Sequence, residues 1–446
     1  MLATSSPICL RQSIQRSFPA CSFPLNSTFP LRMLRSIHTK QTRAIQTMSI
    51  PIHLEGTTLE GGGQLLRIAI GLSSLTKIPV NITNIRGKRS GGGGLKAQHL
   101  TSVQWLSQAS DARLSGAGLK SKEITFAPKE TRRQFENFLK SEIQISQNTP
   151  GSINLVFQAI LPYLLFSGSK YPSKVKISGG TNVSNSPSYE YISQVLLPML
   201  THIGIPTITS SLHSRGWSQG GTQLGSVTYT VTPISTPLPA FQLIDRGDII
   251  SVKATIIAPK ACEQQFRDEL EVMFENREEA IFGDREPMVE VVFENSRHDK
   301  RFYLLLAATT TTGVKLGRDW LYDHAVKVGR SEVIMSSMTK KVFRDLIAEI
   351  EHGGCVDEFL RDQLIVFQAL AKGRSVVNAG RTKEGPVESS LHAKTAQWVV
   401  QEMLGVRFDE EGVCEGIGFG DGEGHGVEER EERVRQSLEK LDVSDV

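Results

Sequence analysis

Short runs of β-strand character alternate with helical stretches from Ile50 onward, and this alternation limits the possible folds more than any other feature of the chain. The run Val80–Ile85 alternates apolar and polar residues, which predicts a strand, whereas Gly63–Leu75 carries apolar residues at helical spacing. Strands interleaved with helices are typical of α/β proteins. The sequence therefore predicts an α/β fold.

The same reading extends along the chain. Further helices are expected at Gln98–Gln108, Ser152–Phe166, Tyr191–Ile203, Glu263–Phe274, Lys340–His352, Val356–Ala371 and His392–Leu404. Further strands are expected at Ile124–Ala127, Lys174–Ile177, Ser226–Thr232, Ile249–Ala258, Val289–Phe293 and Arg301–Ala308. The strands and helix that follow Ile249 make a compact unit of their own, which predicts an inserted subdomain ending near Met338.

The composition is that of a globular protein, because 39% of the 446 residues are hydrophobic and 22% are charged. The longest mainly apolar stretch, Leu155–Phe166, is interrupted by Gln158 and Pro162 and is shorter than the roughly 20 residues that a membrane-spanning helix needs. The five cysteines are scattered without a Cys-x-x-Cys pair, so they give no indication of a zinc ribbon or a thioredoxin-type site. We therefore expect free thiols, and we expect no membrane-spanning segment.

Charge is distributed unevenly along the chain. Residues 1–48 carry six basic residues and no acidic ones, which leaves 44 basic and 47 acidic residues in the body. A nearly neutral body has no general basic field for nucleic acids, so any nucleic-acid site must be a local patch.

Residues 1–48, the basic leader, are also rich in Ser and Pro, a composition that suits a mitochondrial transit peptide. It suits equally well a disordered extension upstream of an internal start at Met33 or Met48.

The first motif is Glu60-Gly-Gly-Gly-Gln-Leu-Leu-Arg67, in which three glycines open a predicted helix. Backbone N–H groups at such a helix start can face an anion. Arg67 lies one turn beyond Gln64 and can reach the same point, and Glu60 can hold a metal that bridges phosphates. Taken alone, however, a glycine-rich segment before a helix is more often a simple turn.

The second motif, Asn84–His99, places four cations beside the tetraglycine Gly91–Gly94, directly before a predicted helix. Arginine side chains suit phosphate oxygens because they donate in pairs. A solvated flexible loop remains an equal alternative for this segment taken alone.

Two later helix starts complete the pattern. In the helix predicted over Val356–Ala371, Phe359, Asp362 and Gln363 share one face, so a ring, a carboxylate and an amide are available to hold a purine. His392 stands at the start of another helix. On pattern alone, an amphipathic helix with one core Phe and an ordinary helix-start histidine are the commoner interpretations.

Together and in this order, these segments resemble the RNA 3′-terminal phosphate cyclases, from about residue 51 to about residue 417. The matching positions are Glu60–Gln64, Ile85-Arg86, Gly94-Leu95, Gln98–Leu100, Gly151-Ser152, Gln158, Gly179–Asn182, Asp245–Gly247, Asp357-Glu358, Asp362–Leu364, Leu391-His392 and Gly416–Gly418.

The resemblance implies a large domain of repeated βαβαββ units with a smaller α/β domain inserted. The predicted domains are accordingly a basic leader over 1–49, a large domain over 50–248 and 339–418, an insert over 249–338, and an acidic solvated tail over 419–446. Such enzymes use ATP and a divalent metal, Mg²⁺ or Mn²⁺, to form a histidyl–AMP intermediate. They pass AMP to an RNA 3′-phosphate and then close a 2′,3′-cyclic phosphate.

The resemblance also assigns roles to individual residues. It makes His392 the nucleophile and Glu60 the metal-binding carboxylate. The residues expected to bind ATP are Gln64, Arg67, Gln158, Pro187, Phe359, Asp362 and Gln363, with Pro187 and Phe359 on the two faces of adenine. The residues expected to bind RNA are Arg86, Arg89, Lys96, Gln98 and His99.

Several positions depart from the family. A run of three glycines is expected near Trp217, where Gly220-Gly221-Thr222 stands, and a second basic residue is expected where Ala97 stands. The family usually has Tyr where Phe359 stands, so stacking is kept and a phenol hydrogen bond is lost. The stretch Thr311–Gly329 matches poorly, which leaves the far edge of the insert open.

Other classes remain as alternatives. A non-catalytic, cyclase-like ribosome-biogenesis factor would share the fold but lack the nucleophilic histidine. An enolpyruvyl transferase would have no use for the helix carrying Phe359. The family is typically nuclear, whereas the leader is compatible with mitochondria.

Overall fold

The structure, a computed structural model, describes residues 50–89, 91–129, 142–324, 331–420, 430, 432 and 433. The predicted leader over 1–49 and most of the predicted tail lie outside these residues. The described chain from residue 50 onward belongs to one compact unit. Within it, no helix is both long and apolar enough to cross a membrane.

The first part of this unit follows the order βαβαββ. Its elements are β1 (Ile52–Glu55), α1 (Gly63–Thr76), β2 (Val80–Thr83), α2 (Ala97–Ala109), β3 (Arg113–Ser115) and β4 (Ile124–Ala127). The strands form a sheet in the order β1-β2-β4-β3, with β1 parallel to β2 and the other pairs antiparallel.

The second part repeats the same order. Its elements are β5 (Ile143–Ser146), α4 (Ile153–Phe166), β6 (Ser173–Gly179), α5 (Tyr189–Tyr191), η1 (Ile192–Leu196), α6 (Leu197–His202), β7 (Thr209–Ser214) and β8 (Gly225–Val231). The sheet order is β5-β6-β8-β7, again with the first pair parallel and the rest antiparallel. The repeated βαβαββ units expected from the sequence are therefore present.

A third, reduced repeat closes the main body. Its elements are β9 (Gln242–Leu243), α10 (Glu358–Leu370), β14 (Lys372–Val377), α11 (Leu391–Leu404) and β17 (Val413–Ile417). Strand β14 is parallel to β9 and antiparallel to β17, so three strands reproduce the pairing of the other repeats. The short strands β15 (Arg381–Thr382) and β16 (Gly385–Pro386) pair separately before α11.

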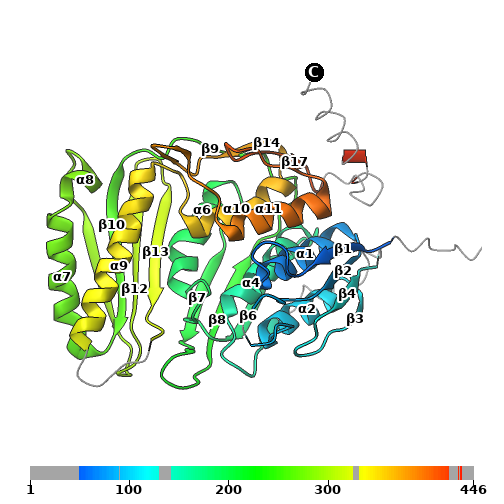
Figure 1. Ribbon diagram of the computed structural model, residues 1–446, viewed down its shortest axis with the longest axis horizontal. Coiled ribbons are helices and arrows are strands. Elements are labelled where there is room, and N and C mark those ends of the chain that lie inside the picture. Colours follow the sequence, from blue (N-terminus) through cyan, green and yellow to red (C-terminus); the bar gives the residue numbers. More distant parts are fainter. Residues whose placement is uncertain are drawn as a thin grey trace, which may run out of the picture. The chain divides into compact units, whose positions relative to one another are not determined.

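A second type of unit is inserted between β9 and α10. Its elements are β10 (Ile249–Ala258), η2 (Lys260–Cys262), α7 (Glu263–Glu275), α8 (Glu278–Phe282), β11 (Val289–Asn295), β12 (Tyr303–Thr310), β13 (Lys315–Leu321) and α9 (Ser331–His352). The sheet order is β11-β10-β12-β13, and α7 and α9 run alongside it (Figure 1). We call these four strands the small sheet.

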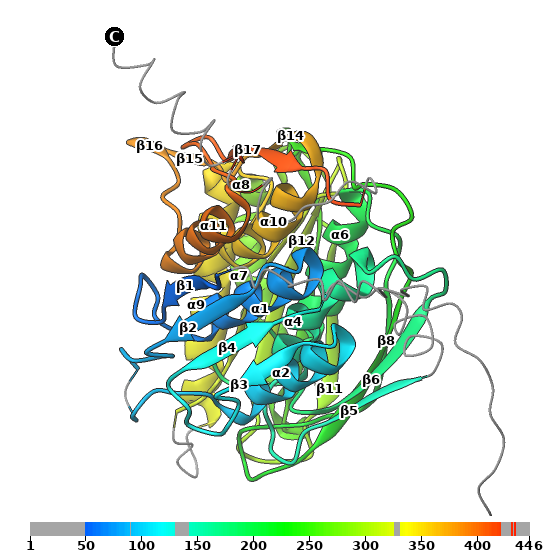
Figure 2. The same cartoon turned by 90° about the vertical axis from the view of Figure 1, so that its right-hand side faces the viewer.

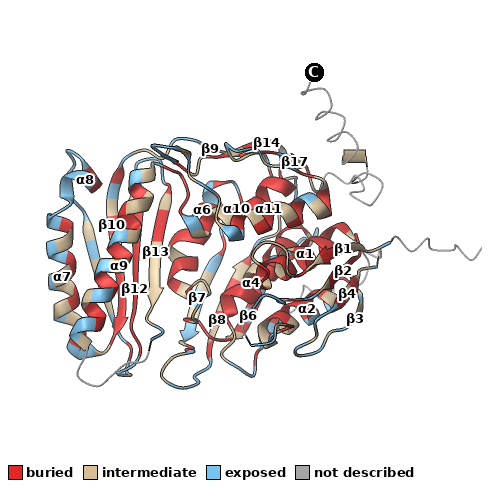
Figure 3. Cartoon of the chain, in the orientation of Figure 1, coloured by how far each residue is buried: buried red, intermediate tan, exposed pale blue. Residues whose placement is uncertain are grey.

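Helices α1, α4, α10 and α11 pack against one another and supply most of the interior of the main body (Figure 2). Their inward faces are buried, as Figure 3 shows. In α1, eleven of the fourteen residues are buried, which exceeds the single stripe of a surface helix. The packing holds these helices in place relative to one another, and the candidate site lies at their N-termini.

The structure differs from the sequence predictions at several elements. The helix expected from Lys340 begins at Ser331, so α9 runs across the predicted domain edge at 338. The single helix expected over Tyr191–Ile203 contains a π-helical turn, η1. Strand β13 was not predicted, because its polar residues interrupt the apolar alternation. The domain edges themselves stay predictions.

Candidate active site

The N-termini of four helices meet at one point of the main body. The Gln98 side chain of α2 accepts a hydrogen bond from the backbone N–H of Ser152, the N-cap of α4, at 3.0 Å. The backbone N–H of Glu60, before α1, donates to Thr395 in the first turns of α11 at 3.1 Å. Because the positive ends of helix dipoles point toward this spot, the arrangement favours a phosphate or another anion.

Glycines allow the helix ends to approach so closely. A Cβ atom on Gly63 would lie 2.3 Å from Nε2 of His99, and one on Gly62 would lie 2.0 Å from the Glu60 carboxylate. Real Cβ contacts are not this short, so a side chain here would have to displace the His99 ring or the Glu60 carboxylate. The glycines at the start of α1 therefore leave room for both groups.

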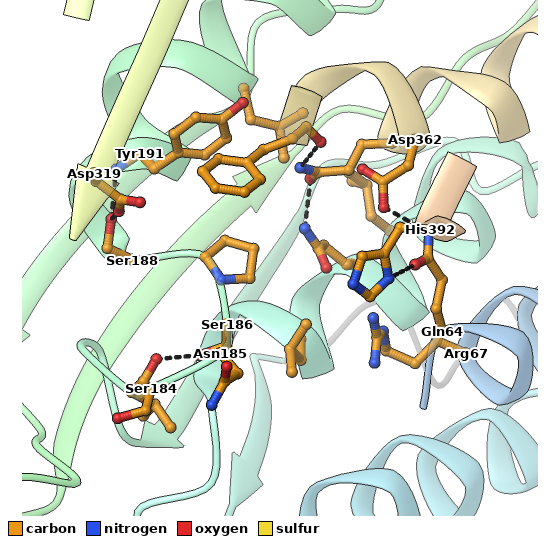
Figure 4. A pocket seen from close by; sticks show the side chains of 18 of the residues that line it. Gln64, Arg67, Ser184, Asn185, Ser186, Ser188, Tyr191, Asp319, Asp362 and His392 are labelled. Atoms are coloured by element: carbon orange, nitrogen blue, oxygen red, sulfur yellow. Dashed lines mark hydrogen bonds between the residues drawn. The ribbon is translucent and has the colours of Figure 1, made fainter. Parts of the chain in front are cut away.

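His392 is the last member of a hydrogen-bonded chain of three side chains, each from a different helix (Figure 4). Nε2 of Gln64 donates to Oδ2 of Asp362 at 2.6 Å, and Oε1 of Gln64 lies 2.6 Å from Nδ1 of His392. A carboxylate accepts, so the amide nitrogen faces Asp362 and the amide oxygen faces the histidine. That oxygen can only accept, which places the proton on Nδ1 and leaves the lone pair on Nε2. We call this chain the Asp362–Gln64–His392 relay.

The surroundings of His392 favour its neutral form. Partial removal of water lowers its pKa, and the charges of Arg67 and Arg89 lower it further, against a smaller opposing effect of Glu358. Burial raises the pKa of Asp362 to about 7, although Gln64 and Arg67 oppose the shift. A neutral imidazole with a free Nε2 is the form that can act as a nucleophile.

The relay borders a pocket of about 440 Å³, a size typical of small-molecule sites. Gln64, Arg67, Asp362 and His392 line one side, whereas Ser188 and Asp319 line the opposite side (Figure 4). The other expected ATP-binding residues, namely Gln158, Pro187, Phe359 and Gln363, also line this pocket. The structure thus brings together all eight residues predicted for the nucleophile and for ATP.

Phe359 and Pro187 are fixed by their surroundings. The Pro187 carbonyl accepts a hydrogen bond from the buried Asn154 side chain at 2.8 Å. Gln158 donates to Gln363, which in turn donates to the Phe359 carbonyl at 2.8 Å. These contacts hold two flat groups at the wall of one pocket, as a site for a planar ring requires.

Glu60 lies beside the helix ends rather than in the pocket lining. One of its carboxylate oxygens pairs with Arg89, and the other, Oε2, is buried without a hydrogen-bond partner. Among the described residues, no cluster of three or more His, Cys, Asp or Glu could form a metal cage. Mg²⁺ is commonly bound by one or two carboxylates together with substrate phosphates and water. A single free carboxylate oxygen fits that mode.

The residues predicted to bind RNA line the approach to the same helix ends. His99 is buried, and burial lowers its pKa to about 3, with Arg67, Arg86 and Lys96 adding to the shift. Arg86 donates to the carbonyl of Gly94 at 3.2 Å. Burial lowers the pKa of Lys96, and the charges of Arg86 and Arg89 lower it further. None of these residues lines the pocket, so the cations form a separate patch next to it.

Sequence reasoning missed one wall of the pocket. Asp319 of β13 accepts hydrogen bonds from Ser188 at 2.6 Å and from Tyr303 at 2.9 Å. Burial raises the Asp319 pKa to about 6. The adjacent Arg318 lies with its guanidinium carbon 4.5 Å from the Phe359 ring centre. The sequence signal for this wall was the pair Arg318 and Asp319 inside a strand, and the strand itself was not predicted.

The fold and the pocket define an α/β protein with repeated βαβαββ units and a nucleotide-sized site at converging helix ends. Comparison with known proteins agrees with this architecture. A model of the family "RNA 3′-terminal phosphate cyclase" matches residues 58–409. The chain therefore belongs to the RNA 3′-terminal phosphate cyclase family.

Individual relatives cover most of the chain. It is 30% identical to a "Probable RNA 3′-terminal phosphate cyclase" of Dictyostelium discoideum over 361 residues, which are 80% of this chain and 77% of the relative. It is 30% identical to the RNA 3′-terminal phosphate cyclase of Drosophila melanogaster over 80% of this chain and 92% of the relative. The cyclase of Staphylothermus marinus is 34% identical over 74% and 87%, respectively.

Proposed function

We propose that this protein converts an RNA 3′-terminal phosphate to a 2′,3′-cyclic phosphodiester at the expense of ATP, with His392 as the covalent nucleophile. The observation that carries the proposal is the relay, which leaves Nε2 of His392 unprotonated beside a nucleotide-sized pocket. Family membership supplies the RNA end as the substrate class, because the relatives carry that name.

In the first step, Nε2 of His392 attacks the α-phosphorus of ATP and the bond to the β-phosphate oxygen breaks. Pyrophosphate leaves, and the Nδ1 proton stays in its hydrogen bond to Gln64. Arg67 and the helix N-termini stabilise the negative charge that builds on the α-phosphate. Burial lowers the Arg67 pKa to about 10, so its guanidinium remains charged at neutral pH.

In the second step, an oxygen of the RNA 3′-phosphate attacks the same phosphorus and the P–Nε2 bond breaks, which restores His392. The neighbouring 2′-OH then attacks the RNA phosphorus, loses its proton and expels AMP. Arg86, Arg89, Lys96 and His99 do not line the pocket, which supports their assignment to the RNA side rather than to ATP.

Glu60 would hold the divalent metal through its free oxygen. When bound there, Mg²⁺ or Mn²⁺ would neutralise phosphate charge and assist the departure of pyrophosphate. Phe359 and Pro187 would enclose adenine, and Asp362 and Gln363 would face the ribose.

The full-length chain with α-labelled ATP and Mg²⁺ tests the proposal. We expect a labelled protein that survives denaturation, loses its label when RNA ending in 3′-phosphate is added, and yields RNA ends resistant to phosphatase. A non-catalytic ribosome-assembly factor would take up no label, and that result would contradict the proposal.

Imaging the full-length chain beside one starting at Met48 would show whether the protein is nuclear, as we propose, or mitochondrial.

Phe359→Ala should weaken ATP binding by about 5- to 150-fold, because stacking on an aromatic ring contributes about 1–3 kcal/mol per base. Phe359→Tyr keeps the ring and should bind within a few-fold of the wild type. Calorimetry with an ATP analogue whose α,β-bridge is methylene measures binding without transfer. Equal affinity of the Ala variant and the wild type would remove the ring from the nucleotide site.

Arg86→Ala should slow AMP transfer to RNA more than it slows self-adenylylation, because the side chain lies beside Lys96 and His99 rather than in the pocket. Single-turnover assays on RNA ending in 3′-phosphate or 3′-OH separate the two steps. Arg113→Ala, on the exposed face of β3, is the matched control. A variant in which only self-adenylylation is slow would move Arg86 to the ATP side.

A further inference from the structure

Three consecutive residues of strand β13 in the small sheet, Gly317 to Asp319, contact residues around the pocket, and Asp319 itself lines it. The backbone N–H of Gly317 donates to Oδ2 of Asp357, the N-cap of α10, at 2.8 Å. Arg318 lies against the ring of Phe359. Asp319 accepts from Ser188, the residue directly after Pro187. One strand of the insert therefore contacts both sides of the slot between Phe359 and Pro187.

Arg318 lies among carboxylates of α9 and α10 at the edge of the pocket. Its Nη1 lies 2.9 Å from both Glu349 of α9 and Glu358 of α10, and its side chain is 14% exposed. The carboxylates hold the guanidinium in a fixed plane, since Arg donates through a rigid, flat group. Tyr191 packs edge-on to Phe359 with ring centres 5.8 Å apart, so the ring is restrained from a second direction.

The usual tyrosine of the family is replaced here by Phe359, which has no hydroxyl to anchor it. A cation–π contact at 4.5 Å can supply that restraint through the ring face instead. Arg318 lies in the stretch Thr311–Gly329, which matches the family poorly.

We propose that Arg318 is a positioning residue that holds Phe359 in the orientation needed to stack on the nucleotide base, and that the small sheet thereby controls nucleotide affinity. The inference rests on the proposed function, because it takes ATP as the ligand of the pocket. Arg318 does not touch the nucleotide; it acts through the ring.

The test is a double-mutant cycle on the full chain, with binding of the α,β-methylene ATP analogue as the readout. Arg318→Lys keeps the charge among the carboxylates but loses the flat, multiply bonded group, and should weaken binding by about 3- to 10-fold. In a Phe359→Ala background the same change should have almost no effect. Arg344→Lys is the control, because exposed Arg344 pairs with Asp345 at 3.0 Å, whereas the cation over the Phe359 ring is Arg318.

Glu358→Gln provides a second variant if Arg318→Lys unfolds, since Glu358 is half exposed and holds the same guanidinium. It should also weaken binding only when Phe359 is present. Equal losses in both backgrounds, or no loss in either, would overturn the inference. Absence of analogue binding by the wild type would instead overturn the proposed function, so the two failures are distinguishable.

Discussion

His392→Ala should abolish formation of the protein–AMP adduct, with the label from α-labelled ATP falling to background. No other described side chain at the pocket is a histidine, and Nε2 of His392 is the nitrogen that the relay leaves unprotonated. The fold should be unaffected, because His392 is an exposed residue in the first turn of α11 whose N-cap, Ser390, is unchanged. The loss should therefore be chemical.

Two measurements support this interpretation. Thermal unfolding of the variant should match that of the wild type, and the methylene analogue should bind within a few-fold. His213→Ala is the control, because His213 is an exposed histidine on β7 whose ring bonds Thr228 and does not line the pocket. An acid-labile adduct that persists in His392→Ala would show that another residue is the nucleophile.

Much of this architecture could be predicted because local patterns determine it. The glycines before α1 mark the helix start, and the apolar run of β10 gives a strand with the predicted bounds, Ile249–Ala258. The π-turn in η1 left no signal, because the apolar spacing around it remains helical. Strand β13 was missed because Arg318 and Asp319 interrupt the apolar alternation, and the Ser188 side chain that bonds Asp319 lies 131 residues away in the sequence.

The candidate site shows the same division between local and distant information. Gln64, Asp362 and His392 were each identified separately, and a family resemblance was needed to choose them over ordinary helix residues. Their mutual contacts join positions separated by 298 and 328 residues. No local pattern reports such a contact, so the tautomer of His392 became accessible only from the structure.

Gln64→Met should reduce the rate of self-adenylylation by about 10²- to 10⁴-fold, the range by which misorienting a catalytic histidine slows other nucleophilic enzymes. Methionine has a similar length but cannot accept from Nδ1 or donate to Asp362. His392 would then rotate and populate both neutral tautomers, so Nε2 would often carry the proton. Buried Asp362 would also lose its hydrogen bond, and its pKa, already raised to about 7, would rise further.

The expected signature is a lower rate at nearly unchanged nucleotide affinity, because both polar ends of the Gln64 amide are engaged by protein rather than facing the ligand. Single-turnover adenylylation and analogue binding measure the two quantities separately. Gln64→Glu retains an oxygen that accepts from Nδ1, so it should recover part of the rate despite repulsion from Asp362. If Gln64→Met instead lost affinity as much as rate, Gln64 would bind the nucleotide directly, and the tautomer of His392 would need another determinant.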